Sequence, residues 1–292
     1  MMMYDSDLPC SRTQPVRAPA EPMRAVPDYM RDASELRVSF AGAGSATRLD
    51  RHYETGSLRL RLPKAQGRCE AVLINTGGGI AGGDRLSVAM ALGPASHVLA
   101  TSQSAEKVYR AEDRPATIAV RLALGPSARL AWLPQETIIH DGARLSRTLD
   151  ADLAPDATLT WLEIMVLGRL ACGERLSQGA LRDRWRIRRG GRLVLAEDVR
   201  LDGNIADKLD RPALGGGARA IATLVHIAPQ AEQRLAGVRA ALATATGAGG
   251  ASAWNGLLVT RIAGPDPAAV RAAVALVAAT VTGDALPRSW SC

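Results

Sequence analysis

One pattern occurs three times in this sequence: VAMALGPASHVLAT at residues 88–101, VRLALGPSARLAWL at 120–133 and LDADLAPDATLTWL at 149–162. In each copy, apolar residues alternate with small or polar ones on both sides of a Leu-Gly/Ala-Pro turn, which predicts a strand, a turn and a second strand. Successive turn prolines lie 32 and 29 residues apart. Units that repeat at such a period predict stacked coils, each of which buries its apolar face against its neighbours.

A looser fourth copy is expected at residues 185–195, with Gly190 and Gly191 as its turn. Its first strand alternates Trp185 and Ile187 with arginines, and we interpret the arginine row as the solvent-exposed face of that strand. One alternative stays open, because strand spacing alone does not distinguish stacked coils from the hairpins of an ordinary β-sandwich.

The last third of the chain changes to helical periodicity. A helix is predicted over residues 231–246. A second helix is predicted to begin with Asp266 as its N-cap and Pro267 as its first residue, to carry a stripe of valines, and to end at Gly283. One further strand is expected between the two helices, over residues 254–262.

The expected architecture is mainly β: a β-solenoid-like or layered β-sheet body of stacked strand-turn-strand units with two C-terminal α-helices. A single domain is predicted over residues 35–292, with the β body at about 35–228 and the helical part at about 229–292. Residues 1–34 combine several prolines with scattered charges and are expected to form a flexible arm.

Composition excludes several classes of protein. The chain has 292 residues, of which 47% are hydrophobic, enough for a buried core. Neither a signal peptide nor an apolar run of about 18 residues occurs, so we expect a cytoplasmic protein without a membrane segment. The formal charge is +7, but no basic block is interleaved with aromatic residues, so no nucleic-acid partner is expected. The four cysteines are far apart, which argues against a disulfide framework and a structural zinc site.

A glycine run follows an apolar stretch and formally matches the dinucleotide motif G-x-G-x-x-G. It consists of Gly77, Gly78, Gly79, Gly82 and Gly83. A dinucleotide site would need a helix that starts at the glycines and an acidic residue about 20 residues later, and a P-loop would need Gly-Lys-Ser/Thr. An alternating strand follows instead. We therefore interpret the run as a structural turn in which two backbones approach closely.

The sequence also lacks the usual signatures of catalysis and metal binding. Its four histidines are isolated, no Gly-x-Ser-x-Gly elbow occurs, and no spacing such as His-Glu-x-x-His is present. We therefore expect neither an enzyme nor a permanently bound metal or cofactor.

Four acidic residues interrupt or end apolar strands: Asp84, Glu136, Glu163 and Glu197. Burial of a carboxylate costs several kcal/mol unless it is paired, hydrated or bound to a cation, so these positions require a reason. Glu136 and Glu163 follow their turn prolines by 10 and 8 residues, so stacked coils would place the two in one row. The alternative, that each acid points outward or pairs with an arginine, stays open.

Six short motifs resemble those of the urease accessory protein UreD (UreH) family. Their order and spacing match from about Gly56 to Trp290, which is most of the chain. The motifs are NTGGGIAGGD (75–84), EKVYR (106–110), WLPQE (132–136), DGA (141–143), LGR with GE (167–169 and 173–174) and LPRSW (286–290).

The resemblance implies a mostly β body with two helices and a non-enzymatic function in assembly. Members of the family bind the accessory protein UreF and, through it, the GTPase UreG, and this complex docks on apo-urease and helps to insert nickel(II). The resemblance also places interior acidic positions at Asp84, Glu163 and Glu197, so these residues, together with Glu136, are the candidate path for nickel in transit. Glu106 departs from the family pattern, which has a small or polar residue before the lysine.

Two other functions stay open at this point. One is a β-solenoid interaction module without metal transfer, and the other is an enzyme that acts on a small molecule at the glycine turn. A neighbouring gene for a urease subunit would favour nickel insertion, whereas a thermal shift with nucleotides or sugars alone would favour the enzyme.

Overall fold

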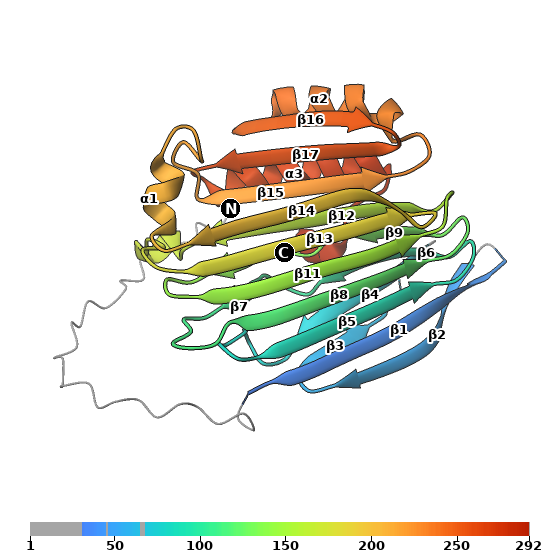
Figure 1. The fold of residues 1–292 in the computed structure, drawn as a ribbon. Helices are drawn as coiled ribbons and strands as arrows, with labels where there is room; N and C mark the ends of the chain where they lie inside the picture. Colours follow the sequence, from blue (N-terminus) through green and yellow to red (C-terminus); the bar gives the residue numbers. More distant parts are fainter. Residues whose placement is uncertain (1–30, 45, 65–67, 292) are drawn as a thin grey trace, which may run out of the picture.

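Two β-sheets pack face to face in the computed structural model, which describes residues 31–44, 46–64 and 68–291 (Figure 1). Sheet A has seven strands, in the spatial order β14 (Arg192–Asp202), β13 (Ala180–Arg189), β11 (Arg144–Leu153), β8 (Ala116–Leu124), β5 (Arg85–Leu92), β1 (Ala33–Ala43) and β2 (Ala46–Thr55). Sheet B has ten strands: in order β16 (Ala248–Trp254), β17 (Leu257–Gly264), β15 (Ala220–Ile227), β12 (Thr158–Leu167), β9 (Arg129–Trp132), β6 (His97–Ser102), β4 (Cys69–Asn75) and β3 (Leu58–Arg61), with β10 (Thr137–Ile139) between β12 and β7 (Glu106–Val108).

The three sequence repeats form stacked coils, as predicted. In each coil the first strand (β5, β8 or β11) lies in sheet A and the second (β6, β9 or β12) lies in sheet B, and equivalent strands pair in parallel with their neighbours. The turns stack as well, because the amide of Ala95 donates to the carbonyl of Pro126 at 2.9 Å. Hairpins of an ordinary sandwich would instead pair the two strands of one repeat with each other. The body is therefore a β-solenoid.

The expected fourth copy has a different topology. Strands β13 and β14 pair with each other in antiparallel register within sheet A, so the second strand does not cross to sheet B. The cause is the turn: Gly190 and Gly191 both have positive φ, 56° and 76°, as a two-residue hairpin requires. The other three copies use longer proline turns, which carry the chain to the opposite sheet.

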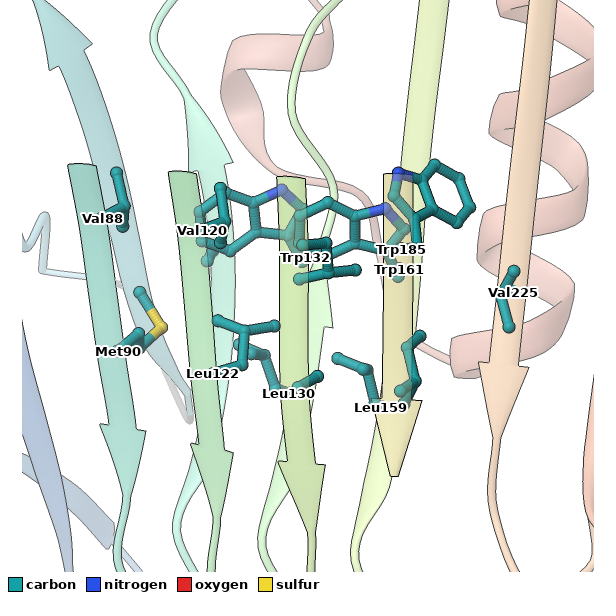
Figure 2. Close-up of a cluster of buried hydrophobic side chains, with 14 of the residues drawn as sticks. Val88, Met90, Val120, Leu122, Leu130, Trp132, Leu159, Trp161, Trp185 and Val225 are labelled. Carbon is teal, nitrogen blue, oxygen red and sulfur yellow. The ribbon is translucent and has the colours of Figure 1, made fainter. Parts of the chain in front are cut away.

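A single apolar layer fills the space between the sheets. Inward-facing side chains of β5, β8, β11 and β13 meet those of β6, β9 and β12. In Figure 2 the indole rings of Trp132, Trp161 and Trp185 form one level of this layer. The rings of Trp132 and Trp161 stack with centroids 5.1 Å apart, and Trp185 meets Trp161 edge to face at 6.1 Å. These contacts tie sheet A to sheet B at the level of the buried charges described below.

The helices α2 (Leu235–Thr244) and α3 (Pro267–Thr282) form a second apolar cluster with the outer face of sheet B. The amide of Ala268 donates to the Asp266 carboxylate at 2.9 Å, and Gly283 ends α3 in the left-handed conformation, as predicted from the sequence. A short 3-10 turn (Ala231–Arg234) precedes α2, and the strand expected between the two helices is β17 with its partner β16.

The elements that were not predicted include the helix α1 (Ile205–Asp210), the 3-10 turns Leu170–Cys172 and Arg288–Trp290, and the strands β1, β2, β7, β10, β15 and β16. Among the described residues, none of the helices combines the length and the apolar character that a membrane span requires. The expected arm at residues 1–34 lies outside the described residues except for its last four, and Ala33 and Ser34 already belong to β1.

Candidate functional site

Sheet B is interrupted at two neighbouring positions. The break between β6 and β7 spans residues 103–105, and the break between β9 and β10 spans residues 133–136. The two breaks contact each other, because the amide of Gln135 donates to the Ser102 hydroxyl at 2.9 Å and the amide of Glu106 donates to the Glu136 carbonyl at 2.8 Å. A cavity of about 210 Å³ lies behind them, between the sheets.

The polar lining of this cavity comes from both sheets. Sheet A contributes Arg147, and sheet B and its breaks contribute Glu163, Glu106, Lys107 and Gln135. The remaining lining is mostly apolar and backbone. The cavity is thus a small chamber inside the β-solenoid, with a few charged and polar groups on a mostly apolar wall.

A buried cluster of one cation and two carboxylates forms one wall. The Arg147 guanidinium binds Asp183 through two hydrogen bonds of 3.1 and 2.6 Å and also donates to Glu163. All three side chains are buried, and Trp185 Nε1 donates to Asp183 at 2.8 Å. Since Arg147 and Asp183 come from sheet A and Glu163 from sheet B, the cluster joins the two sheets.

Of the two carboxylates in this cluster, Glu163 has the less compensated charge. Burial raises its pKa from 4.5 to about 7, because the stabilising field of Arg147 is shared with Asp183, whose negative charge also raises it. Burial therefore favours the protonated form of Glu163 more than in a free carboxyl group, and the side chain lines the cavity.

Glu106 is the second acid on the cavity wall. Its carboxylate accepts hydrogen bonds from Asn75 Nδ2 at 3.0 Å and from the amide of Lys107 at 3.1 Å. Burial raises its pKa as well. The departure from the family pattern at this position therefore lies on the same cavity as Glu163.

The other three predicted acids lie outside the cavity lining. Asp84 is buried and accepts backbone hydrogen bonds from Asp32 and Ala81 at 2.9 and 2.7 Å, which close the turn after the glycine run. Glu197 pairs with Arg261 at 2.5 Å and links strands β14 and β17 of the two sheets. The structure therefore does not bring the four predicted acids together.

Glu136 and Glu163 do not form one row. Thr137, next to Glu136, lines the cavity, and because side chains alternate along a strand, Glu136 points to the other face of sheet B. There it pairs with Arg271 of α3 at 2.7 Å. Glu163 points inward and Glu136 outward, so each acid has an arginine partner on its own side.

Residues 284–291, which we call the C-terminal strap, cover the break at residues 133–136 from outside. Gln135 Nε2 donates to the Ser289 carbonyl at 2.5 Å, and Trp290 Nε1 donates to the Leu133 carbonyl at 3.1 Å. Arg271 donates to the Trp290 carbonyl at 3.0 Å, and its guanidinium lies 4.7 Å from the centre of the Trp290 ring. The strap thus closes the outer side of the wall that separates the cavity from α3.

The glycine run packs against β7 and the residues that follow it. A Cβ at Gly79 would overlap the Tyr109 ring, and one at Gly82 would overlap Ala111. The Tyr109 hydroxyl donates to the Gly78 carbonyl at 2.8 Å, and Gly78 also lines the cavity. Strand β5 follows the run directly, so in the described part of the chain no helix begins at the glycines.

Two indole groups beside the cluster have no hydrogen-bond acceptor. Trp132 Nε1 and Trp161 Nε1 are buried and unpartnered within the part of the chain that the structure describes. Trp132 also lines the cavity. Buried donors of this kind are usually satisfied by ordered water, and a cavity of this volume has room for several molecules. The chamber is therefore suited to hold water.

Metal ligation inside the described residues is limited to single carboxylates. No three side chains of His, Cys, Asp or Glu gather there as a ligand set. Glu163 and Glu106 could each offer one carboxylate, with water completing the coordination of a divalent ion. Such positions suit brief contact with an ion more than its storage.

Sequence reasoning missed Arg147 and Asp183. Both occupy inward positions of alternating strands: Arg147 lies between buried Leu145 and Leu149, and Asp183 precedes buried Trp185 by two residues. A charge at the apolar position of a strand is the signal that could have identified them.

Comparison with known proteins agrees with these features. The family described as UreD urease accessory protein matches residues 32–291. A urease accessory protein UreD of Methylobacterium sp. (strain 4-46) is 52% identical over 269 residues, covering 89% of this chain and 95% of its own. A second, from Methylorubrum populi, is 49% identical over 280 residues, covering 93% and 94% of the two chains. With this match across nearly all of both chains, the protein belongs to the UreD family of urease accessory proteins.

Proposed function

We propose that this protein, together with UreF and the GTPase UreG, docks on apo-urease in the cytoplasm and conducts nickel(II) toward the urease active site. Membership of the UreD family supports a role in urease maturation. The observation that carries the finer proposal is the chamber inside the solenoid, with the carboxylates of Glu163 and Glu106 on its wall.

The chemistry of the chamber fits an ion in transit. Carboxylates and water are acceptable ligands for a divalent first-row cation, and isolated carboxylates bind it weakly enough to release it. In this proposal the protonation state of Glu163 controls its attraction for the cation. The ionised carboxylate attracts nickel(II), and the protonated carboxyl group attracts it more weakly. Nickel is the cargo in this proposal, and the chain itself holds no permanent metal or cofactor.

The candidate path is centred on Glu163 and Glu106. Asp84, Glu136 and Glu197 are less well supported as path residues, because each has a structural partner outside the cavity lining. GTP is held by UreG in this proposal, and the glycine run serves as a packed turn.

The test compares conservative changes inside and outside the chamber. Glu163→Gln and Glu106→Gln keep side-chain size while removing the charge that attracts nickel, and Glu197→Gln is the matched control on a more exposed ion pair. We expect the nickel content of urease matured with either chamber variant to fall severalfold, while the control stays within twofold of wild type.

Retention of UreF by each variant distinguishes a role of these carboxylates in nickel transfer from a purely structural role. The Arg147–Asp183 pair remains balanced in Glu163→Gln, so fold and complex should survive. Normal nickel loading with both chamber variants would contradict the path and favour an interaction module without metal transfer. Reduced loading together with loss of UreF would favour a purely structural role.

A further inference from the structure

The outer face of sheet A is a broad surface of small and charged side chains. Helices α2 and α3 pack on sheet B, so neither covers it (Figure 1). Side chains alternate along each strand, and the outward positions of β5 and β8 include Ala89, Ala91 and Ala123. These alanines form the floor of a shallow groove of about 510 Å³. Such a floor permits another flat surface to approach closely.

The charges of this face nearly balance, but they are arranged in rows. Arg37 of β1 lies on one side of the alanine floor, and Asp150 and Asp152 of β11 lie on the other side, next to Arg121 of β8. Arg37 pairs with Glu35 at 2.6 Å, yet its side chain stays 66% exposed. In the described part of the chain, neither aspartate carboxylate makes a hydrogen bond or an ion pair. The best complement is therefore a surface that offers cations to β11 and carboxylates to β1.

A second copy of the same face offers this arrangement. The register between strands places one row of outward side chains across β2, β1, β5, β8, β11 and β13: Tyr53, Arg37, Ala89, Arg121, Asp150 and Arg186. Half a turn about an axis along the strands, midway between β5 and β8, exchanges the two sides of the row. The level along the strands stays the same, so each row faces its own copy.

The central strands become complementary in this arrangement. Strand β11 of each copy lies over β1 of the other, so that Asp150 faces Arg37 of the second copy. Strand β8 lies over β5, so that the long side chain of Arg121 faces the small Ala89. Two sheets of the same twist stay parallel when such an axis relates them, which is the aligned packing of β-sandwiches.

The outermost strands form the rim, where β13 of each copy lies over β2 of the other. Arg186 then faces Tyr53, whose ring is 52% exposed and can accept a cation on its face. At the next level Arg51 faces Arg188, and solvent at the rim screens these two like charges. The attractive contacts thus lie at the centre, where less water remains.

The size of the face suits a reversible dimer. The strands from β2 to β13 span about 24 Å at about 4.8 Å per step, and the eight residues of β5 extend over about 26 Å. This area is roughly 600 Å² per copy, or about 1,200 Å² in total, which is the lower end of the range for specific interfaces.

We infer that this chain forms a symmetric homodimer through the outer face of sheet A, in which Asp150 of each copy binds Arg37 of the other. The alanine floor permits the close approach, and the two Asp150–Arg37 contacts fix the register. Sheet B of each copy faces away from the dimer, so the breaks in sheet B and the C-terminal strap remain uncovered. The inference does not depend on the proposed function.

Charge reversal on either side of the contact tests the dimer. Arg37→Asp and Asp150→Arg each place like charges at both symmetric contacts, whereas a mixture of the two variants restores opposite charges at both. Ala91→Trp fills the floor without a change of charge. Arg211→Asp is the matched control, because Arg211 is exposed, lies outside sheet A and changes the net charge as Arg37→Asp does.

Sedimentation equilibrium of each full chain, without partners, measures the mass over a wide range of concentration. We expect wild type to dimerise with a Kd in the micromolar range, and each of the three face variants to raise this Kd at least tenfold. The control should stay within twofold of wild type. An equal mixture of Arg37→Asp and Asp150→Arg should dimerise within about threefold of wild type, and circular dichroism checks that every variant is folded.

Three results would overturn the inference. One is a wild-type mass of one chain at every concentration. Another is self-association that neither charge reversal nor Ala91→Trp changes, including the formation of larger aggregates. The third is weakened self-association that the mixture of charge variants does not restore. If wild type stays a single chain while Arg37→Asp and Asp150→Arg lose binding to UreF, the face belongs to that partner and the homodimer is wrong.

Discussion

Arg147 lies at an inward position of β11, where its neighbours two residues away are buried leucines. Its guanidinium can neutralise one carboxylate. Because it makes two hydrogen bonds to Asp183, the charge of Asp183 is the better neutralised of the two. Glu163 is compensated only in part by the same guanidinium, and burial raises the pKa of its carboxyl. A buried cluster with one excess acid costs stability, which is typical of positions that are retained for function.

Stability should depend on pH through Glu163. The pKa of its carboxyl is about 7 in the folded chain and returns to about 4.5 on unfolding. The folded state therefore binds the extra proton, and stability should fall as pH rises from about 4.5 to about 7 and then level off. Relative to Glu163→Gln, which cannot titrate, wild type should lose on the order of 3 kcal/mol over this range.

Urea unfolding of both proteins from pH 4.5 to 8 measures this difference. Titration of groups distant from Glu163 is common to the two chains and cancels in the comparison. A stability difference between wild type and Glu163→Gln that does not change with pH would contradict the raised pKa.

Helix α3 is the element that covers the outer face of sheet B. Its valine stripe, including Val270, Val274 and Val277, is fully buried against β15, β17 and the neighbouring helix α2. The same helix exposes Leu276, at 48%, on its opposite side. Since α3 also carries Arg271, its position fixes the C-terminal strap over the break in sheet B.

Substitution on the two faces of α3 should affect the stability of the folded chain to very different extents. Val274→Asp places an unpaired charge in the buried stripe and should destabilise the chain by several kcal/mol, with loss of soluble protein. Leu276→Asp makes the same kind of change on the exposed face and should leave the melting temperature within a few degrees of wild type. Thermal unfolding by circular dichroism compares them, and equal effects would show that the stripe is not the packed face.

At the scale of the whole molecule, strand alternation separates two surfaces. Inward positions of β5, β8 and β11 supply the core and the charged wall of the cavity, while outward positions supply the exposed face of sheet A. The glycine run and the strand breaks lie at the cavity and close it with backbone packing. Within the residues that the structure describes, neither surface presents a helix N-terminus with a glycine-rich phosphate loop.

The purified chain should therefore neither bind nor hydrolyse GTP. Tyr109 and Ala111 occupy the space beside Gly79 and Gly82 that a nucleotide phosphate would need. Equilibrium dialysis with GTP, with UreG as the positive control, measures this directly. Binding of GTP by the chain alone in the low micromolar range would show that the turn is more than structural.

The sequence alone determined the three strand-turn-strand units and the helix α3, whereas the parallel pairing that stacks the units as coils was decided by the tertiary structure. Alternating apolar residues around repeated proline turns decide strand, turn and strand locally, and Asp266, Pro267 and Gly283 mark the ends of the helix through short-range hydrogen bonds and backbone preference. Such signals lie within a few residues of one another, so they can be recognised without knowledge of the fold. Whether the second strand of the fourth unit crosses to the opposite sheet could not be recognised in this way. A crossing connection and a hairpin both begin as a strand and a turn.

The tertiary structure decided which charges meet. Arg147, Glu163 and Asp183 lie on three different strands, and their contact depends on how the sheets are registered face to face. Glu136 and Glu163 occupy similar places in the sequence repeat, yet they end on opposite faces of sheet B because the strand is broken between β9 and β10. The pairing of side chains across two sheets depends on long-range packing, and the sequence pattern carries only the period of each strand.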